Sequence, residues 1–238
     1  MINRFLPAFL FAGVAAAALT ASLVISHRAA AGQVILAPAP AVDEVPKPGV
    51  TSATAVFAGG CFWGVQGVFQ HVKGVTGAVS GYAGGTKADA SYQTVSSGTT
   101  GHAESVMITY DPSEITYGEL LRIYFSVVAD PTTLDAQGPD EGPQYRSDIF
   151  VTTPEQAKIA KSYIAQLEQA HVYAAPVVTK ITPFTAFYRA EGYHQNYLTL
   201  HPNNPYIAAN DMPKVEGLKA LFGKDYRSDP VLTPAAAN

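Results

Sequence analysis

The sequence is short of several residue types that particular classes of protein require. Cys61 is the one cysteine in 238 residues, so the chain can form neither an internal disulfide nor a thiolate cluster for zinc. Charged residues make up 14% of the chain and the net charge is −4, which predicts no basic surface for nucleic acid. Hydrophobic residues make up 47%, which is too many for a disordered protein. We therefore expect a folded domain that needs no disulfide and binds no nucleic acid.

Residues 1–31 have the pattern of a targeting segment. Arg4 precedes an uncharged apolar stretch, residues 5–25, and Ala29-Ala30-Ala31 matches an A-x-A cleavage site. At about 21 residues the stretch is also long enough to cross a bilayer. We therefore expect either a cleaved signal peptide or an N-terminal membrane anchor. In a bacterium both would export the rest of the chain to the periplasm, soluble after cleavage or tethered to the inner membrane by residues 5–25.

The remaining chain divides by composition into three parts. Residues 32–51 are a linker rich in proline and alanine, which is expected to be extended and semi-rigid. We expect residues 52–225 to form a single domain that is long enough to bury a sizeable core, and residues 226–238 to form a flexible tail. Within the domain, short strands and helices alternate irregularly, which predicts an α+β fold, a two-layer α/β sandwich with a mixed sheet. The modest size and the lone cysteine favour a monomer.

Cys61 lies where a nucleophile is expected. It follows an apolar run, residues 53–58, and two glycines, which predict a strand and a tight turn, and it precedes a predicted helix over residues 65–72. The positive end of that helix would stabilise a thiolate, so we expect the thiol pKa to fall below its usual value of about 8.5. The alternative is a small buried hydrophobe. Flanking glycines and the adjacent Phe62 and Trp63 favour the nucleophile.

Glu104 is a candidate general acid. The run 103–110 alternates as a strand does, and Glu104 shares one face with Val106, Ile108 and Tyr110. Burial on that apolar face would raise the carboxyl pKa, and a neutral carboxyl can donate a proton near pH 7. A glutamate turned to solvent at the end of the strand, or paired with a lysine, is the alternative. The residues alone leave both open.

Polar loops hold three further candidates, Tyr92, Tyr145 and Asp140. Tyrosine hydroxyls can bind an oxygen atom and a carboxylate can orient its neighbours, although each residue taken singly is more often a surface or packing residue. Tyr145 and Asp140 belong to a long loop, residues 130–146, and long loops in compact domains tend to be functional. No histidine pair has metal-ligand spacing.

Several short motifs occur together in one order. They are Gly60-Cys61-Phe62-Trp63-Gly64, Gly81-Tyr82-Ala83-Gly84-Gly85, Ser91-Tyr92, Gly101-His102-Ala103-Glu104, Gln144-Tyr145-Arg146-Ser147 and Tyr193-His194-Gln195-Asn196-Tyr197-Leu198. In this order and spacing they closely resemble the peptide methionine sulfoxide reductases of the A type, over roughly residues 53–223. The resemblance implies an oxidoreductase that repairs oxidised proteins by reducing methionine-S-sulfoxide, in proteins and as the free amino acid, to methionine.

The resemblance also implies roles for the candidate residues. Cys61 would attack the sulfoxide sulfur and become a sulfenic acid. Glu104 would give a proton to the departing oxygen, while Tyr92 and Tyr145 would form hydrogen bonds to that oxygen. Asp140 would support the site.

Substrate binding and recycling follow from the same resemblance. Phe62 and Trp63 would form the apolar wall that receives the S-methyl group, and no metal or organic cofactor is implied. Many members of the family carry resolving cysteines in the C-terminal segment, but residues 203–212 contain none. The sulfenic acid would therefore need an external thiol, from a thioredoxin-like protein, a glutaredoxin-like protein or a small molecule.

Two other functions remain open on the sequence alone. A Cys–His hydrolase would need a histidine base beside Cys61, and no local signature identifies one. A non-catalytic exported binding module would keep the fold and tolerate Cys61→Ser.

Overall fold

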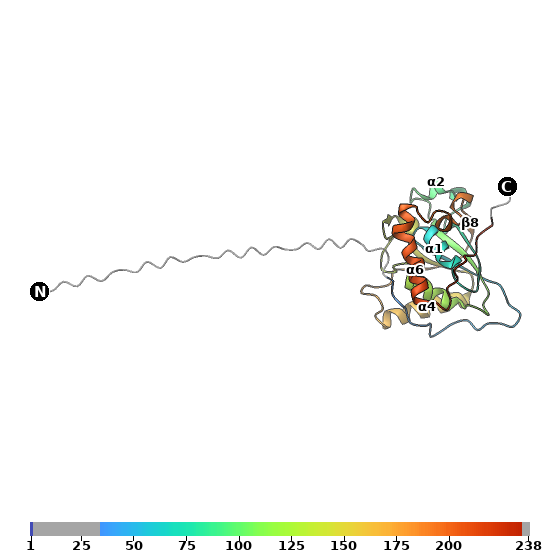
Figure 1. Cartoon of the computed structure of the whole chain (residues 1–238), viewed down its shortest axis with the longest axis horizontal. Coiled ribbons are helices and arrows are strands. Elements are labelled where there is room, and N and C mark those ends of the chain that lie inside the picture. Colours follow the sequence, from blue (N-terminus) through green and yellow to red (C-terminus); the bar gives the residue numbers. More distant parts are fainter. Residues whose placement is uncertain (2–33, 235–238) are drawn as a thin grey trace.

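The computed structural model describes Met1 and residues 34–234 (Figure 1). Apart from Met1, the predicted signal peptide or anchor over residues 1–31 lies outside the described residues. Among those that are described, no helix is long and apolar enough to span a bilayer.

The centre of the domain is a six-stranded mixed sheet. Its strands are β1 (Ala53–Gly59), β2 (Val75–Ala83), β3 (Ala103–Tyr110), β6 (Ser147–Val151), β7 (Lys180–Pro183) and β8 (Phe187–Arg189). They are arranged in the order β7-β6-β1-β3-β2-β8, with β6 and β7 parallel and the other neighbours antiparallel. Because β1 pairs with β3, the strand that leads to Cys61 is bonded to the strand that carries Glu104.

The helices pack on one face of this sheet, which confirms the predicted α+β fold with a mixed sheet. They are α1 (Phe62–Gln70), α2 (Tyr92–Val95), α3 (Tyr117–Ile123), α4 (Pro154–Gln169), α5 (Tyr197–Leu200) and α6 (Met212–Leu221). α1 contacts both the sheet and α6 (Figure 1). The main core lies between the two layers and includes Phe57 of β1, Phe69 of α1 and Tyr163 of α4. Val56 and Phe150 belong to a smaller cluster, because successive strand residues face opposite sides.

Local sequence signals explain how helix α4 begins. The Thr153 hydroxyl accepts a hydrogen bond from Gln156 N–H at 3.1 Å, and Pro154 occupies the first turn of α4. The Gln156 side chain in turn accepts from Thr152 N–H, so the run Thr153-Pro154-Glu155-Gln156 forms the cap of this helix.

The long loop over residues 130–146 has structure of its own. It contains a short hairpin, β4 (Ala136–Gln137) and β5 (Asp140–Glu141), followed by a 3₁₀ turn over Pro143–Tyr145. The hairpin fixes Asp140, and the turn fixes Tyr145.

Residues 34–50 contain no helix or strand, but they are bound to the domain. Ala37 is buried, and its carbonyl accepts a hydrogen bond from Arg122 Nε at 2.9 Å. The carboxylates of Asp43 and Glu44 accept hydrogen bonds from the first two N–H groups of α3, at 2.8 and 2.7 Å. The described part of the predicted linker thus has no helix or strand, and it also caps α3 and covers part of the core.

The C-terminal segment is bound as well. Val231 N–H donates to the Gln70 carbonyl at 3.0 Å, and Thr233 is 5% exposed with its hydroxyl inside the domain. The prediction of a flexible tail is corrected for residues 226–234, which lie along α1. Residues 235–238 lie outside the described residues.

Candidate active site

A tight turn places Cys61 at the start of α1. Gly60 adopts a φ of +91°, which only glycine adopts freely, and a Cβ atom there would lie 2.6 Å from Cβ of Gln137. Cys61 is then the last residue before the helix, with φ −52° and ψ 121°. The turn thus delivers the thiol to the positive end of α1, as the sequence predicts.

The thiol lies in a cavity of about 180 Å³. The structure brings all seven residues singled out from the sequence to this cavity, together with one more, Tyr206. The lining residues are Cys61, Phe62, Trp63, Tyr92, Glu104, Asp140, Tyr145 and Tyr206. They come from α1, α2, β3, the hairpin loop and the turn before α6.

Glu104 is a buried, neutral acid. Its side chain is 3% exposed, and Oε2 accepts a hydrogen bond from Phe62 N–H at 3.0 Å. Burial raises the pKa of this carboxyl to about 8; the Phe62 N–H opposes the rise, and Asp140 and Asp211 add to it. The alternative of a solvent-exposed glutamate is therefore excluded, and the carboxyl holds its proton at neutral pH.

The thiol of Cys61 behaves differently from the prediction. Burial raises its pKa well above the ordinary value. Glu104, once it has lost its proton above about pH 8, and the carboxylates of Asp211 and Asp140 raise it further. The Trp63 N–H acts in the opposite direction. The predicted fall of the pKa is wrong because desolvation and nearby carboxylates outweigh the helix end. Cys61 is therefore a thiol, not a thiolate, at neutral pH.

The hydroxyl groups around the cavity are hydrogen-bond donors. Burial raises the pKa of Tyr92 and of Tyr145, and the Glu104 charge adds to both shifts. Tyr206 donates its O–H to Asp140 Oδ2, and burial raises the pKa of that carboxyl. Asp140 therefore supports Tyr206, and the phenols stay protonated over the physiological range.

The indole of Trp63 is held on three sides. Its ring stacks on Tyr197, with centroids 3.9 Å apart and planes 13° apart, and Tyr206 approaches edge-on at 6.0 Å. Its Nε1–H donates to Nδ1 of His194 at 3.1 Å. This bond places the histidine proton on Nε2. The indole is thus a fixed apolar wall of the cavity.

Tyr92 is anchored through its backbone. Its N–H donates to Glu191 Oε1 at 2.9 Å, and Tyr82 O–H donates to Oε2 of the same carboxylate at 2.8 Å. One carboxylate therefore joins the start of α2 to strand β2.

Sequence reasoning missed Tyr206 and Asp211 as members of this region. Both lie in the segment 203–212, which attracted notice only for its missing cysteines. Asn204-Pro205-Tyr206 is an ordinary turn signal, and Asp211 stands before Met212-Pro213 as a helix cap would. Neither pattern distinguishes a site residue from a structural one.

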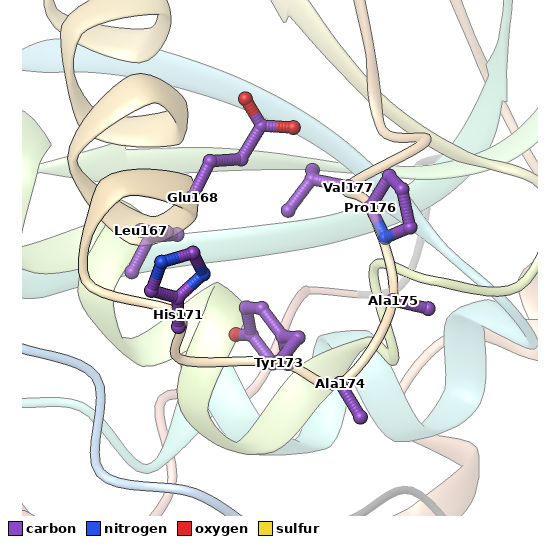
Figure 2. A pocket seen from close by; sticks show the side chains of 8 residues that line it. All are labelled: Leu167, Glu168, His171, Tyr173, Ala174, Ala175, Pro176 and Val177. Atoms are coloured by element: carbon purple, nitrogen blue, oxygen red, sulfur yellow. The ribbon is translucent and has the colours of Figure 1, made fainter.

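Other chemistry finds less support in the residues that the structure describes. The cavity around Cys61 has no histidine in its lining, so no base for a Cys–His hydrolase is present there. Within Met1 and residues 34–234, no group of three His, Cys, Asp or Glu side chains could hold a metal. A larger cavity of about 270 Å³ lies between the last turn of α4 and the loop that follows it (Figure 2). Leu167, Pro176 and Val177 line it, and it contains none of the candidate residues.

Comparisons with known proteins agree with this site. The family model for peptide methionine sulfoxide reductase matches residues 53–226. The chain is 61% identical over 197 residues to peptide methionine sulfoxide reductase MsrA 2 of Mesorhizobium japonicum, covering 83% of this chain and 100% of that protein. It is 49% identical over 187 residues to MsrA 2 of Synechocystis sp., covering 78% of this chain and 87% of that protein.

Two solved structures are similar in fold and sequence. Reduced Mxr1 from Saccharomyces cerevisiae superposes with a TM-score of 0.57 at 31% identity, over 70% of this chain and 94% of that one. Methionine sulfoxide reductase A of Corynebacterium diphtheriae superposes with a TM-score of 0.56 at 30% identity, over 76% of this chain and 92% of that one.

Proposed function

This chain belongs to the peptide methionine sulfoxide reductase family and reduces methionine sulfoxide to methionine, and from that premise we propose how its residues divide the reaction. One observation carries the proposal. The lone cysteine and a carboxyl that is neutral at pH 7 share a single small cavity. A nucleophile for sulfur and an acid for oxygen are the two groups that this reduction needs.

Binding orients the sulfoxide for both groups. The S-methyl group lies against the Trp63 indole and the Phe62 ring, which are the apolar part of the cavity. The sulfoxide oxygen accepts hydrogen bonds from Tyr92 and Tyr145, whose hydroxyls keep their protons. The sulfur is then presented to Cys61.

Proton donation and attack follow. Glu104 gives its proton to the sulfoxide oxygen, which makes the sulfur more electrophilic, and Cys61 Sγ bonds to that sulfur. The hydroxyl group then moves from the substrate sulfur to Sγ as the bond between the two sulfurs breaks. Methionine leaves, and Cys61 becomes a sulfenic acid. The thiol proton replaces the one that Glu104 donated, so the number of protons is unchanged. The cysteine is oxidised by two electrons and the sulfoxide is reduced by two.

An external thiol completes the cycle. With Cys61 as the one cysteine of the sequence, no internal disulfide can form. A thiol from outside attacks Sγ of the sulfenic acid and releases water, and a second thiol then frees Cys61 from the mixed disulfide. A thioredoxin-like protein, a glutaredoxin-like protein or a small thiol can supply both.

Turnover of separate epimers tests the assignment. Wild type and Cys61→Ser are given the S or the R epimer of a blocked methionine sulfoxide with excess dithiol. We expect turnover of the S epimer alone, abolished in the variant. Without reductant, wild type is expected to release one equivalent of methionine per chain. Turnover by Cys61→Ser, or more than one equivalent without reductant, would contradict the proposed cycle.

We also propose that the chain is exported and works as a monomer. The targeting pattern of residues 1–31 supports export, and the modest size of the chain favours a monomer. Cell fractionation with N-terminal sequencing tests export. A soluble form that starts near Gly32 indicates cleavage, a full-length membrane form indicates an anchor, and a full-length cytosolic form would refute both. Sedimentation at micromolar concentration reports the oligomeric state.

A further inference from the structure

Asp211 is a buried carboxylate with no role in the reaction described above. The residue is 0% exposed, and neither of its carboxylate oxygens has a hydrogen-bond partner among the residues that the structure describes. The ammonium group of Lys214 lies 3.7 Å from Oδ1, beyond hydrogen-bond distance. This long ion pair is the one charged contact that the described residues give the carboxylate. A buried carboxylate with no hydrogen bond is unfavourable, so its presence calls for an explanation.

The carboxylate lies against the first turn of the helix that carries Cys61. A Cβ atom on Gly64 would lie 2.1 Å from Asp211 Oδ1 and 2.7 Å from its Cγ. The carboxylate therefore occupies space that is open only because residue 64 has no side chain. This contact gives a physical reason for the second glycine of Gly60-Cys61-Phe62-Trp63-Gly64.

This position sets a negative charge at the positive end of α1. The helix end alone would favour a thiolate at Cys61, and a carboxylate beside the same turn opposes that effect. Burial raises the Asp211 pKa to about 6, while Lys214 lowers it and Asp140 raises it. Asp211 is therefore charged at neutral pH.

Other groups also face Cys61. Glu104 from β3 acts on it more strongly when charged than Asp211 does, and Asp140 from β5 acts more weakly. Lys214 from α6 lowers the pKa of both aspartates. The remaining titratable groups nearby are phenols, Tyr92, Tyr145 and Tyr206. Because Glu104 is protonated below about pH 8, Asp211 is the strongest negative charge acting on Cys61 at neutral pH.

We propose that Asp211 is a positioning residue: together with burial, its charge holds Cys61 in the protonated, unreactive form until a substrate binds. The proposal rests on the proposed role of Cys61 as the nucleophile. In a chain with one cysteine, no second thiol of the protein can react with the sulfenic acid before it is oxidised further. That further oxidation, to the sulfinic acid, is irreversible. Holding the proton on the resting thiol limits that loss.

Alkylation of Cys61 by iodoacetamide tests the proposal without any sulfoxide. Rates are measured from about pH 5 to 10 on the purified protein. Asp211→Asn and Asp211→Ala both remove the charge, and we expect each to move the midpoint to lower pH and to raise the rate at pH 7.5 by at least about threefold. Glu104→Gln should raise the rate only above about pH 8, where Glu104 loses its proton in wild type.

Controls separate charge from packing. Asp225→Asn removes a partly exposed carboxylate beyond the other end of α1, and it should leave the midpoint unchanged. An unchanged midpoint in both Asp211 variants overturns the proposal and leaves Asp211 a packing residue.

Wild type alone gives a second readout if neither Asp211 variant folds. Its alkylation rate should exceed a single-ionisation curve below about pH 6, where Asp211 takes up a proton. A curve that follows one ionisation through this range overturns the proposal. Since alkylation needs only a reactive thiol, failure of the epimer assay and failure of this test are distinguishable.

Discussion

Buried polar groups surround helix α1 at two places, its first turn and the side chain of Gln66. At its start, Asp211 and the Nε2 atom of His194 are buried without hydrogen-bond partners. Farther along, Gln66 donates from Nε2 to the Ala78 carbonyl at 2.8 Å and to Gln195 Oε1 at 3.0 Å. Its Oε1 accepts from Asn196 N–H at 2.8 Å. The start of α1 thus includes charged and polar groups without hydrogen bonds, whereas the side chain of Gln66 is fully paired.

The groups at the start of α1 determine reactivity, and the hydrogen-bonded groups around Gln66 determine stability. Burial raises the energy of a charge, so the pKa values of Cys61, Glu104 and Asp211 all depart from their usual range. The amide and backbone groups around Gln66 carry no charge that titrates, and each hydrogen bond between them adds a modest amount to stability. Substitutions at the start of α1 should therefore change reactivity, and substitutions along its paired part should change unfolding.

The largest expected effect is on activity, from Glu104→Gln. The amide cannot give a proton, so kcat/KM should fall by about 10²- to 10⁴-fold. In wild type, kcat/KM should fall as the pH rises through about 8, the pKa of this carboxyl. An activity within threefold of wild type, measured with the S epimer from pH 6 to 9, would remove Glu104 from the role of acid.

The same variant should gain stability at high pH. The folded state binds the Glu104 proton up to about pH 8, while an unfolded glutamate releases it near pH 4.3. Wild type therefore loses this part of its stability as the pH rises from about 4.3 to 8, and Glu104→Gln does not. Urea unfolding at pH 6 and pH 9 should show that the variant's advantage grows with pH. An equal difference at both values would mean that the site does not titrate as described.

The second effect is on unfolding, from Gln195→Leu in the paired region. Gln195 bonds both the N–H and the carbonyl of Ser80, at 3.0 and 2.9 Å, as well as Gln66. Its loss leaves buried groups unsatisfied, and we expect urea unfolding to show about 2–4 kcal/mol of destabilisation. The control is Gln166→Leu, which removes two exposed bonds to Ala39 and Ala41 and should cost less than about 1 kcal/mol. Equal effects would contradict the comparison.

Local patterns predicted the parts of the site that depend on local structure. The turn at Gly60 and the burial of Glu104 follow from a glycine pair and from strand alternation, so both could be predicted from a few neighbouring residues. The packing of Ala37 and Thr233 could not, because composition reports only that a segment avoids helix and strand. The two segments are held by residues far along the chain, because Arg122 binds the Ala37 carbonyl and Gln66 binds the Thr233 hydroxyl.

The electrostatics of Cys61 show the same limit. The helix end is a local property and was predicted, whereas the carboxylates that outweigh it come from β3, from the hairpin loop and from the start of α6. Asp211 is 150 residues along the chain from Cys61, and only the fold brings them together. The direction of a pKa shift can therefore be predicted only from the tertiary structure, even when the sequence identifies the residue that titrates.

The smallest effect compares two threonines whose hydroxyl groups are buried. The Thr233 hydroxyl donates to the Ala78 carbonyl and accepts from Gln66 Nε2 at 3.2 Å. The Thr199 hydroxyl has no partner among the residues that the structure describes. Valine has nearly the same shape, so Thr233→Val should cost about 1 kcal/mol in urea unfolding. Thr199→Val should cost nothing or stabilise, because an unpaired buried hydroxyl is itself unfavourable. If the two variants unfold at the same urea concentration, the hydrogen bonds of the Thr233 hydroxyl to Gln66 and Ala78 do not contribute to the stability of the fold.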